Sequence, residues 1–451
     1  MAAASLVCAA AAALAGCGSS GGKGGGGERA PARPPKALTI YSDLPVLGPT
    51  GVTGAQQSAA QAQGIENGAR LALEQWGHTV RYGRRGHRGS FHVYFKPMND
   101  ATPGTGAWSQ DLTAANAQRA ASQPTTVAYI GDYDSAATAL SLPELSPAGI
   151  LQVSPWSPYV GFTDVNAADG KGDPARFYPP NGANDFARLV PSDVGEAQAI
   201  VQYMHTLGVA RLYVLGDVSV FDATVAQLVA NDAPLAGMTL VGSRNNIDTQ
   251  TNDEPLGYAQ IVADVAAARP DAVLLGGTPG VGAIALWQEL HAQLPDAKLF
   301  APSTLATPAF LGGIAAAGGR CTGPAGVSVS CQPASGSTYV TSPILRLRQY
   351  PASARAVFRA YHRRFKMTPT AYALYGYSAM QDVLKAIRLT GRFTSDRPRL
   401  LDVFFHHLGV IDGVIGSYTI DGRGDSSLQT FDGYRVSAAG ALVFDREITL
   451  G

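Results

Sequence analysis

The sequence predicts an α/β protein built from two lobes, each with a mainly parallel sheet. Short apolar runs rich in strand formers alternate with helical segments along most of the chain, and this alternation is typical of parallel sheets with crossover helices. Polar loops follow several of these runs. At 451 residues the chain also exceeds the size of one ordinary hydrophobic core, so at least two lobes are expected.

The stretch 127–157, VAYIGDYDSAATALSLPELSPAGILQVSPWS, shows the repeating unit most clearly. An apolar strand over 127–131 precedes a polar loop, a helix over 136–145, a strand over 150–153 and a second polar loop. In such a unit both loops lie at the carboxyl ends of parallel strands, where open α/β sheets bind ligands. Ser135 is expected either to cap the helix or to offer its hydroxyl to a ligand at the helix start.

The segments before and after this unit extend the first series. Strands are expected over 37–42 and 91–97, and helices over 64–76 and 107–122. The Gly-, Pro- and Gln-rich stretch 43–63 is predicted to be a loop. The polar, aperiodic stretch 161–185 is too long for a routine connection, so an inserted surface loop is expected there.

A second series begins after Pro191. Its helices are expected over 194–207, 223–229, 258–268 and 283–293, and its strands over 211–216, 238–244, 271–276 and 298–301. The last third is expected to hold helices over 353–365, 371–390 and 398–408, then antiparallel strands over 414–420, 429–435 and 441–445. Too few apolar strands remain there for another core, so this part is expected to complete the two lobes by crossing between them.

The N-terminus has the features of an export signal. A short apolar run over 2–15 overlaps Leu14-Ala15-Gly16-Cys17, and a Gly- and Ser-rich tract follows. The tetrapeptide resembles the lipobox of bacterial lipoproteins, in which the cysteine carries lipid. The prediction is therefore a signal peptide over 1–17 and a flexible tether over 18–36. The alternative is an Ala-rich unstructured start with a chance cysteine.

The cysteines and the charge balance fit an exported protein that does not bind nucleic acid. Of the four cysteines, Cys8 would leave with the signal and Cys17 would be lipidated. Cys321 and Cys331 are expected to form a disulfide across a short loop, which would add about 2–3 kcal/mol to stability. The 34 basic residues balance the 34 acidic ones, which argues against the basic surface that nucleic acids select.

No pattern in the sequence supports catalysis, a cofactor or a metal site. The nucleophile elbow, the zinc-protease motif and the phosphate-binding loop are all missing. The glycine-rich stretch 277–282 lacks the spacing of a dinucleotide site. The paired His406 and His407 have no acidic or cysteine partner at ligand spacing, so a surface pair is expected.

The order of elements resembles the type 1 solute-binding proteins of branched-chain amino acid ABC importers. The resemblance runs from Leu38 to the end and depends on an ordered set of weak motifs. These motifs are LPVLGPTG at 44–51, GIENGARLAL at 64–73, IGDYDS at 130–135 and VSPWS at 153–157. It implies two Rossmann-like lobes joined by a multi-strand hinge. The first lobe would comprise 37–190 plus 333–408, and the second 191–332 plus 409–451.

The resemblance also implies a set of ligand-binding residues. Hydroxyls and amides of the two first-lobe loops would hold the ligand's carboxylate, while the second lobe would add an aromatic side chain and further polar groups. The family's ammonium-pairing acid falls on a serine, Ser303, and Asp132, Asp134 or Asp217 could supply a carboxylate from another direction. The expected residues are Ser135, Asp134, Trp156, Ser157, Phe221, Thr278 and Ser303.

The function implied is extracytoplasmic binding of a small polar solute, such as an amino acid or an amide. The protein would deliver this solute to an ABC transporter permease as a monomer anchored by lipid to the cell membrane, without a cofactor. Two alternatives stay open: a ligand-sensing receptor domain of the same fold, and a secreted α/β hydrolase.

Overall fold

The computed structural model describes eight stretches of the chain. They are 37–47, 53–83, 88–104, 106–164, 176–178, 184–251, 258–323 and 327–451, without the side chains of 53–58. The predicted signal peptide, the tether and Cys17 lie outside these residues, as does most of the loop predicted over 161–185.

Six strands form the first sheet, in the order β2-β3-β1-β4-β5-β6. All neighbours are parallel except β2 and β3, which pair antiparallel. The strands are β1 Ala37–Asp43, β2 Thr79–Tyr82, β3 Gly89–Met98, β4 Thr126–Ile130, β5 Leu151–Ser154 and β6 Phe186–Arg188.

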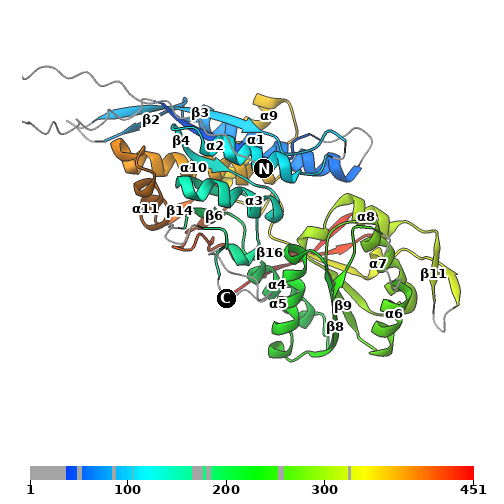
Figure 1. The fold of residues 1–451 in the computed structure, drawn as a ribbon. Helices are drawn as coiled ribbons and strands as arrows, with labels where there is room; N and C mark the ends of the chain where they lie inside the picture. The colour runs from blue at the N-terminus through cyan, green and yellow to red at the C-terminus, as the bar shows by residue number, and fades with distance from the viewer. Residues whose placement is uncertain are drawn as a thin grey trace, which may run out of the picture. The chain divides into compact units, whose positions relative to one another are not determined.

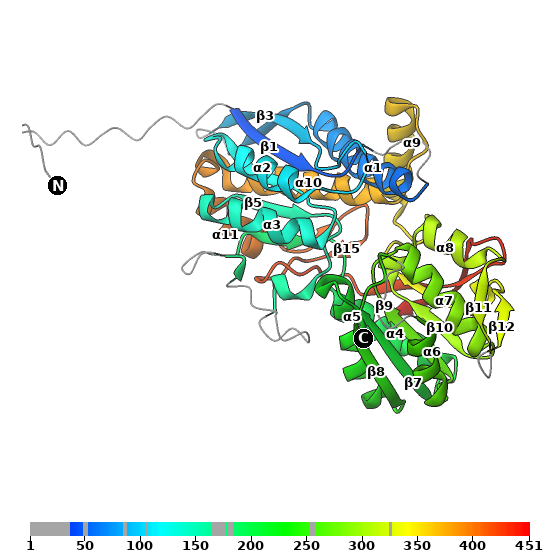
Figure 2. The same cartoon turned by 45° about the vertical axis from the view of Figure 1, so that its right-hand side comes forward.

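Helices cover both faces of this sheet (Figures 1 and 2). Alternate residues of a strand point to opposite faces, so Tyr41 and Tyr129 pack with α2 and α3, whereas Ile40 and Ile130 face the helices on the other side. One layer contains α2 Gln110–Ala121 and α3 Ser135–Leu145. The other contains α1 Thr53–Gln75, α9 Ala352–Phe365, α10 Tyr372–Thr390 and α11 Arg397–His407.

Seven strands form the second sheet, in the order β17-β16-β13-β10-β9-β7-β8. Five neighbouring strands, β13, β10, β9, β7 and β8, run parallel to one another. β16 and β17 extend the sheet beyond β13 with antiparallel pairing. The strands are β7 Arg211–Asp217, β8 Thr239–Ile247, β9 Ala272–Gly276, β10 Lys298–Ala301, β13 Thr338–Ser342, β16 Thr430–Val436 and β17 Leu442–Thr449. The predicted α/β class with two mainly parallel sheets is confirmed.

The second sheet is also covered on both faces. Leu212, Val214 and Leu274 pack against α4 Asp193–Thr206 and α5 Val220–Asp232. Their strand neighbours, including Tyr213 and Leu275, face the opposite layer. That layer contains α6 Tyr258–Ala267, α7 Val281–Gln293 and α8 Pro308–Ala315.

Helices α1 and α10 pack closely because glycines lie at their contact. A Cβ on Gly68 would come within 2.0 Å of the Ala373 carbonyl oxygen, and one on Gly376 within 2.0 Å of the Ile65 carbonyl oxygen. Only glycine fits at such backbone separations. The contact joins a helix near the start of the chain to one more than 300 residues later, and so fixes the C-terminal part on the first sheet.

Several elements differ from the prediction. α1 begins at Thr53 instead of residue 64, so the second half of the predicted loop 43–63 is helical. β13 and α8 were not predicted. The strand predicted over 414–420 pairs only at β15 Ser417–Tyr418, with β14 Ile411–Asp412, apart from an isolated bridge at Ile420.

Three of these elements, β13, β14 and β15, also depart from the expected division into lobes. β13 lies in 333–408, the part expected in the first lobe, yet it pairs with β10 in the second sheet. Conversely, Ile411 and Tyr418 belong to the part expected in the second lobe, yet they pack into the core beneath the first sheet.

Cys321 and Cys331 form the predicted disulfide. It joins the small hairpin of β11 Arg320–Thr322 to the residue just after β12 Ser328–Ser330. In the described part of the chain, no helix combines the length and the apolar run needed to cross a bilayer.

Candidate functional site

A cavity of about 180 Å³ is lined by loops that follow strands of both sheets. The first sheet contributes the segments after β4 and β5, and the second contributes those after β7, β9 and β10. All five are carboxyl ends of parallel strands, the edge at which open α/β sheets bind ligands. The lining residues are Gln61, Tyr133, Asp134, Ser135, Trp156, Pro158, Asp193, Phe221, Asp222, Val225, Thr278, Pro279, Ser303, Thr304, Ala306, Thr307 and Tyr372.

Six of the seven residues expected from the sequence line this cavity, and Ser157 does not. Ser157 is fully buried behind the wall. Its hydroxyl lies 2.5 Å from the hydroxyl of Thr138 and 3.3 Å from the carbonyl oxygen of Asp132. The chain bends just after β5, and it is Trp156 and Pro158 that reach the lining.

Asp134, and not Ser135, caps α3. The Asp134 carboxylate accepts a hydrogen bond of 2.8 Å from the Ala136 amide, while Ser135 is the first residue of the helix. An Asp side chain at this position pairs a free amide and also favours the positive end of the helix dipole. The Ser135 hydroxyl instead accepts from the Tyr159 amide at 3.3 Å, which leaves its proton free to donate.

The second-sheet wall is held by hydrogen bonds around Thr278. The Thr278 hydroxyl donates to the Asp222 carboxylate at 3.1 Å, and its amide donates to Asp217 at 2.9 Å. Asp217 also accepts from Thr249 and from the Ser219 amide, so it braces three segments and lies outside the lining. Phe221 and Asp222 lie in the first turn of α5, which begins earlier than predicted.

Sequence reasoning missed several lining residues, including Tyr133, Tyr372, Asp193 and Asp222. The three rings of Tyr133, Trp156 and Tyr372 lie with centroids 5.1–6.2 Å apart. Tyr133 and Asp222 are each adjacent in sequence to an expected residue, and this adjacency is the signal by which the sequence could have indicated them. Tyr372 and Asp193 reach the cavity only because the starts of α10 and α4 are brought to it.

Burial shifts the acids of the wall toward their protonated forms. Removal from water raises the pKa of Asp193 to about 8, and Glu196 and Asp222 add to this shift while Arg188 opposes it. Burial also raises the pKa of Asp222 to about 6, assisted by the negative charge of Asp134. The pKa of Asp134 is raised too, again mainly by burial.

A separate group of acids lies buried beneath the first loop. Carboxyl oxygens of Asp43, Asp100 and Asp132 lie within 4.8 Å of one another, a spacing that a metal ion can bridge. The Tyr129 hydroxyl lies 3.2 Å from Asp43 and 3.1 Å from Asp132. Burial raises the pKa of Asp43 to about 9 and that of Asp132 to about 8. Burial raises the pKa of Asp100 only to about 6, so protonation of Asp43 and Asp132 relieves most of the repulsion in this group at neutral pH.

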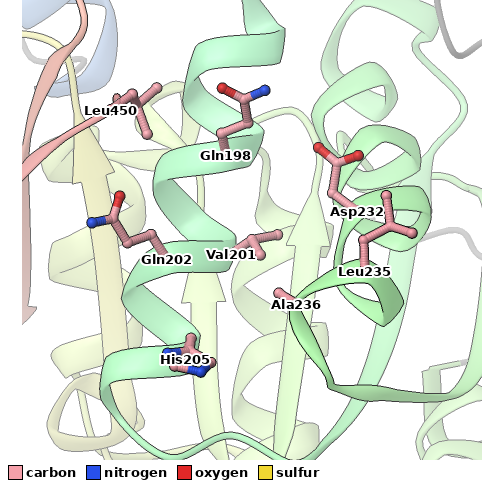
Figure 3. A pocket seen from close by; sticks show the side chains of 8 residues that line it. All are labelled: Gln198, Val201, Gln202, His205, Asp232, Leu235, Ala236 and Leu450. Carbon is pink, nitrogen blue, oxygen red and sulfur yellow. The ribbon is translucent and has the colours of Figure 1, made fainter.

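Another cavity, of about 550 Å³, lies between α4 and the end of α5 and includes none of the expected residues (Figure 3). Asp232 and Leu235 line one side and Gln198 and Gln202 the other. It does not lie at the carboxyl ends of the parallel strands, and no group of converging polar side chains marks it as a ligand site.

Comparisons with known proteins agree with this geometry. The chain matches the family model of periplasmic binding proteins over residues 46–441. The comparison with curated proteins returns no match.

Solved structures of similar fold include a leucine-binding protein from Thermotoga maritima, with a TM-score of 0.63, 17% identity, and coverage of 92% of this chain and 99% of that one. A solute-binding protein of an ABC transporter from Rhodopseudomonas palustris, in complex with p-hydroxybenzoic acid, has a TM-score of 0.64 and 12% identity, with 92% and 96% covered. A branched-chain amino acid binding protein from Streptococcus pneumoniae, in complex with isoleucine, has a TM-score of 0.60 and 14% identity, with 92% and 99% covered. Because the family model spans most of the sequence, this chain belongs to the periplasmic binding proteins, which bind solutes and are not enzymes.

Proposed function

We propose that the cavity at the carboxyl ends of the two sheets binds a small organic solute outside the cytoplasm. The loaded protein then delivers this solute to the permease of an ABC importer. The observation that carries the proposal is that loops of both sheets contribute polar and aromatic side chains to one cavity. Such a site, with a few polar groups among aromatic walls, suits a small ligand.

The solutes bound by similar structures support this size class. The Streptococcus pneumoniae protein holds isoleucine, and the Rhodopseudomonas palustris protein holds p-hydroxybenzoic acid. Both are compact organic molecules with a carboxylate and a hydrocarbon part. At identities of 12–14% these structures share the fold, so the ligand of this chain has to be argued from its own residues.

The solute would favour the arrangement in which both sheets contact it. Phe221 of α5 already packs against Tyr159 of the first-sheet loops, with ring centroids 4.9 Å apart. A ligand that touches Ser135 on one side and Thr278 on the other gains contacts only when the two sides are close, so binding and closure are coupled. We assign the two sides to lobes that carry the first and second sheets, respectively.

A thermal-shift screen tests the proposal. Amino acids, amides, aromatic acids and amines are added singly at millimolar concentration, and a true ligand should raise Tm because it binds only the folded protein. Isothermal titration of each hit then gives Kd and stoichiometry. Absence of any shift across all four classes would contradict solute binding.

We also propose lipid anchoring through Cys17. The LAGC tetrapeptide and the Gly-rich stretch after it support this proposal at the sequence level alone. Expressed in a bacterium with lipoprotein processing, the wild-type protein should partition with membranes, and Cys17→Ser should release it or leave it uncleaved. Membrane association of a Cys17→Ser protein that has lost residues 1–16 would contradict the anchor.

A further inference from the structure

The cavity wall carries acids from both sheets without a balancing base. Asp134 belongs to the first-sheet wall, and Asp222 lies opposite at the start of α5. Asp193, at the start of α4, is the third. Among the described residues that line the cavity there is no Lys, Arg or His. Before a solute binds, the electrostatic potential at such a wall is negative wherever the carboxyls are ionised.

Each of these acids retains acceptor capacity after its hydrogen bonds within the protein are counted. Asp134 accepts from the amides of Ala136 and Ala137, and Asp222 accepts from the hydroxyls of Thr278 and Ser219. Asp193 accepts from the Val160 amide at 3.3 Å. A carboxylate offers about four lone-pair sites, so one or two bonds leave at least half of them free. Asp193 is also almost completely buried, at 2% exposure, where an unbalanced charge is unfavourable.

The cation that acts on Asp193 is already committed elsewhere. Arg188 is fully buried and pairs with Asp425 at 2.8 Å. Its other nitrogens donate to the Tyr159 carbonyl and to the Thr163 hydroxyl, both at 2.7 Å. It does not reach the lining, so it holds loops together and does not offer a charge to a ligand.

The usual place for a ligand's anionic group in this edge is also occupied. The amide of Ala136 at the start of α3 would suit a carboxylate, because a helix N-terminus attracts negative charge. Asp134 already accepts that hydrogen bond. A ligand carboxylate placed there would meet the Asp134 charge, and the hydroxyl of Ser135 is the donor that remains beside it.

Aromatic rings form the rest of the first-sheet wall. Tyr133, Trp156 and Tyr372 pack together, and Phe221 of α5 also lines the cavity. Aromatic faces attract ammonium groups, and acids beside them strengthen this preference. Acids and aromatic rings without bases together select a cation.

From this wall we infer that the solute of the cavity carries a positively charged nitrogen, as an amine or a quaternary ammonium, and has no carboxylate of its own. The inference rests on the proposed function of the same cavity and narrows its substrate class. The missing acid at position 303 is then no loss of charge recognition, since Asp222 supplies the carboxylate from another element and Asp193 adds a second acid to the same wall. A carboxylate on the ligand would be repelled by the same groups.

Matched ligand pairs test the inference on the wild-type protein. Benzylamine is compared with benzoate and benzamide, isoamylamine with leucine and isoamyl alcohol, and choline serves as the quaternary probe, all by isothermal titration at pH 7.5. At least one cation should bind 10-fold or more tightly than its anionic, zwitterionic and neutral counterparts. Tighter binding of leucine or benzoate, or equal binding of the neutral compounds, overturns the inference but leaves the proposed function standing. No binding by any compound counts against both.

A variant pair locates the charge recognition. Asp222→Asn should weaken the preferred cation 10-fold or more while leaving the neutral counterpart within about 3-fold. Asp232→Asn is the matched control, since Asp232 lies on the same helix but in the other cavity (Figure 3). Circular dichroism and Tm check that both variants fold. An unchanged cation affinity in Asp222→Asn overturns the inference, and if that variant does not fold, the wild-type pairs decide.

Discussion

Ser303 donates two hydrogen bonds to Glu196: its amide at 2.6 Å and its hydroxyl at 2.7 Å. Glu196 lies on α4 and is 3% exposed, and it also accepts from the Thr341 hydroxyl at 2.8 Å. Position 303 is where the resemblance to the amino-acid-binding proteins expects an acid. The acid present here lies behind the wall and holds the segments after β10 and in β13 onto α4.

Glu196→Ala should therefore destabilise the protein whether or not a solute is bound. It leaves one buried donor, the Thr341 hydroxyl, and two part-buried donors of Ser303 without an acceptor. An unpaired buried group costs about 1–3 kcal/mol, and a part-buried one costs less. We expect a loss of at least about 2 kcal/mol in the free energy of unfolding, measured by urea denaturation.

Glu196→Gln is the matched variant for this site. Its amide oxygen can accept from the Ser303 amide and from Thr341, and its NH2 group can donate to the Ser303 hydroxyl. It should lose less stability than Glu196→Ala and bind solute as the wild type does. Equal stability of Glu196→Ala and the wild type would contradict a structural role for this acid.

Phe221→Ala should weaken solute binding because Phe221 lines the cavity and packs edge-to-face on Tyr159. Truncation removes apolar contact with the solute and the ring contact between the two walls. An aromatic pair of this kind contributes about 0.5–1.5 kcal/mol beyond buried area. We expect a 10-fold or greater rise in Kd by isothermal titration for any solute found in the screen.

Phe393→Ala is the control for that change, since Phe393 is 38% exposed and outside the cavity. It should leave Kd unchanged. If Phe221→Ala and Phe393→Ala bind equally well, the cavity is not the solute site.

The stability of the protein should fall as pH rises from 6 to 9. Burial, with repulsion from Asp132 and Asp100, raises the pKa of Asp43 from 3.8 to about 9, and burial raises that of Asp185 from 3.8 to about 8. Between the unfolded pKa and the folded pKa, each of these acids holds a proton in the folded state that it has released in the unfolded state. The stabilisation from this difference is complete below pH 4 and disappears as pH rises through 8–9.

Asp43→Asn should reduce that pH dependence. The asparagine oxygen can accept from Asn116, and its NH2 group can donate to the Tyr129 hydroxyl, which replaces the existing bonds at 3.0 and 3.2 Å. The variant has one titrating group fewer, so its free energy of unfolding should depend less steeply on pH, by up to about 1.4 kcal/mol per pH unit. Urea denaturation at pH 6, 7.5 and 9 measures it, and parallel curves for variant and wild type would argue against a protonated Asp43.

Loss of the disulfide should lower stability and spare binding. Cys321 and Cys331 close a short hairpin that contributes no residue to the cavity. The double variant Cys321→Ser/Cys331→Ser should lose about 2–3 kcal/mol, measured by urea denaturation, because the open loop has more freedom in the unfolded state. The Kd for a confirmed solute should stay within about 2-fold. A large change in Kd would mean that the hairpin influences the site.

Local sequence predicted most helices and strands of both sheets within a few residues. It failed where tertiary contacts define an element. The segment TYVTS of β13 is short and polar, and it is a strand because β10 and β16 pair with it on either side. The first half of α1 lacks apolar periodicity, yet its Ala and Gln residues favour a helix that is continuous with the part packed on α10.

The candidate site, too, was predicted in part from the sequence and decided in part by tertiary contacts. The sequence by itself determined which loops end the parallel strands, and its resemblance to the solute-binding proteins named Ser135, Trp156, Phe221, Thr278 and Ser303, all of which line the cavity. Only the tertiary structure decided which side chains face that cavity. Ser157 turns inward, Asp134 takes the helix cap, and Asp193 and Asp222 bring carboxyl groups from α4 and α5. The physical reason is that strand and helix patterns are set by near neighbours, whereas side-chain exposure depends on packing between distant segments.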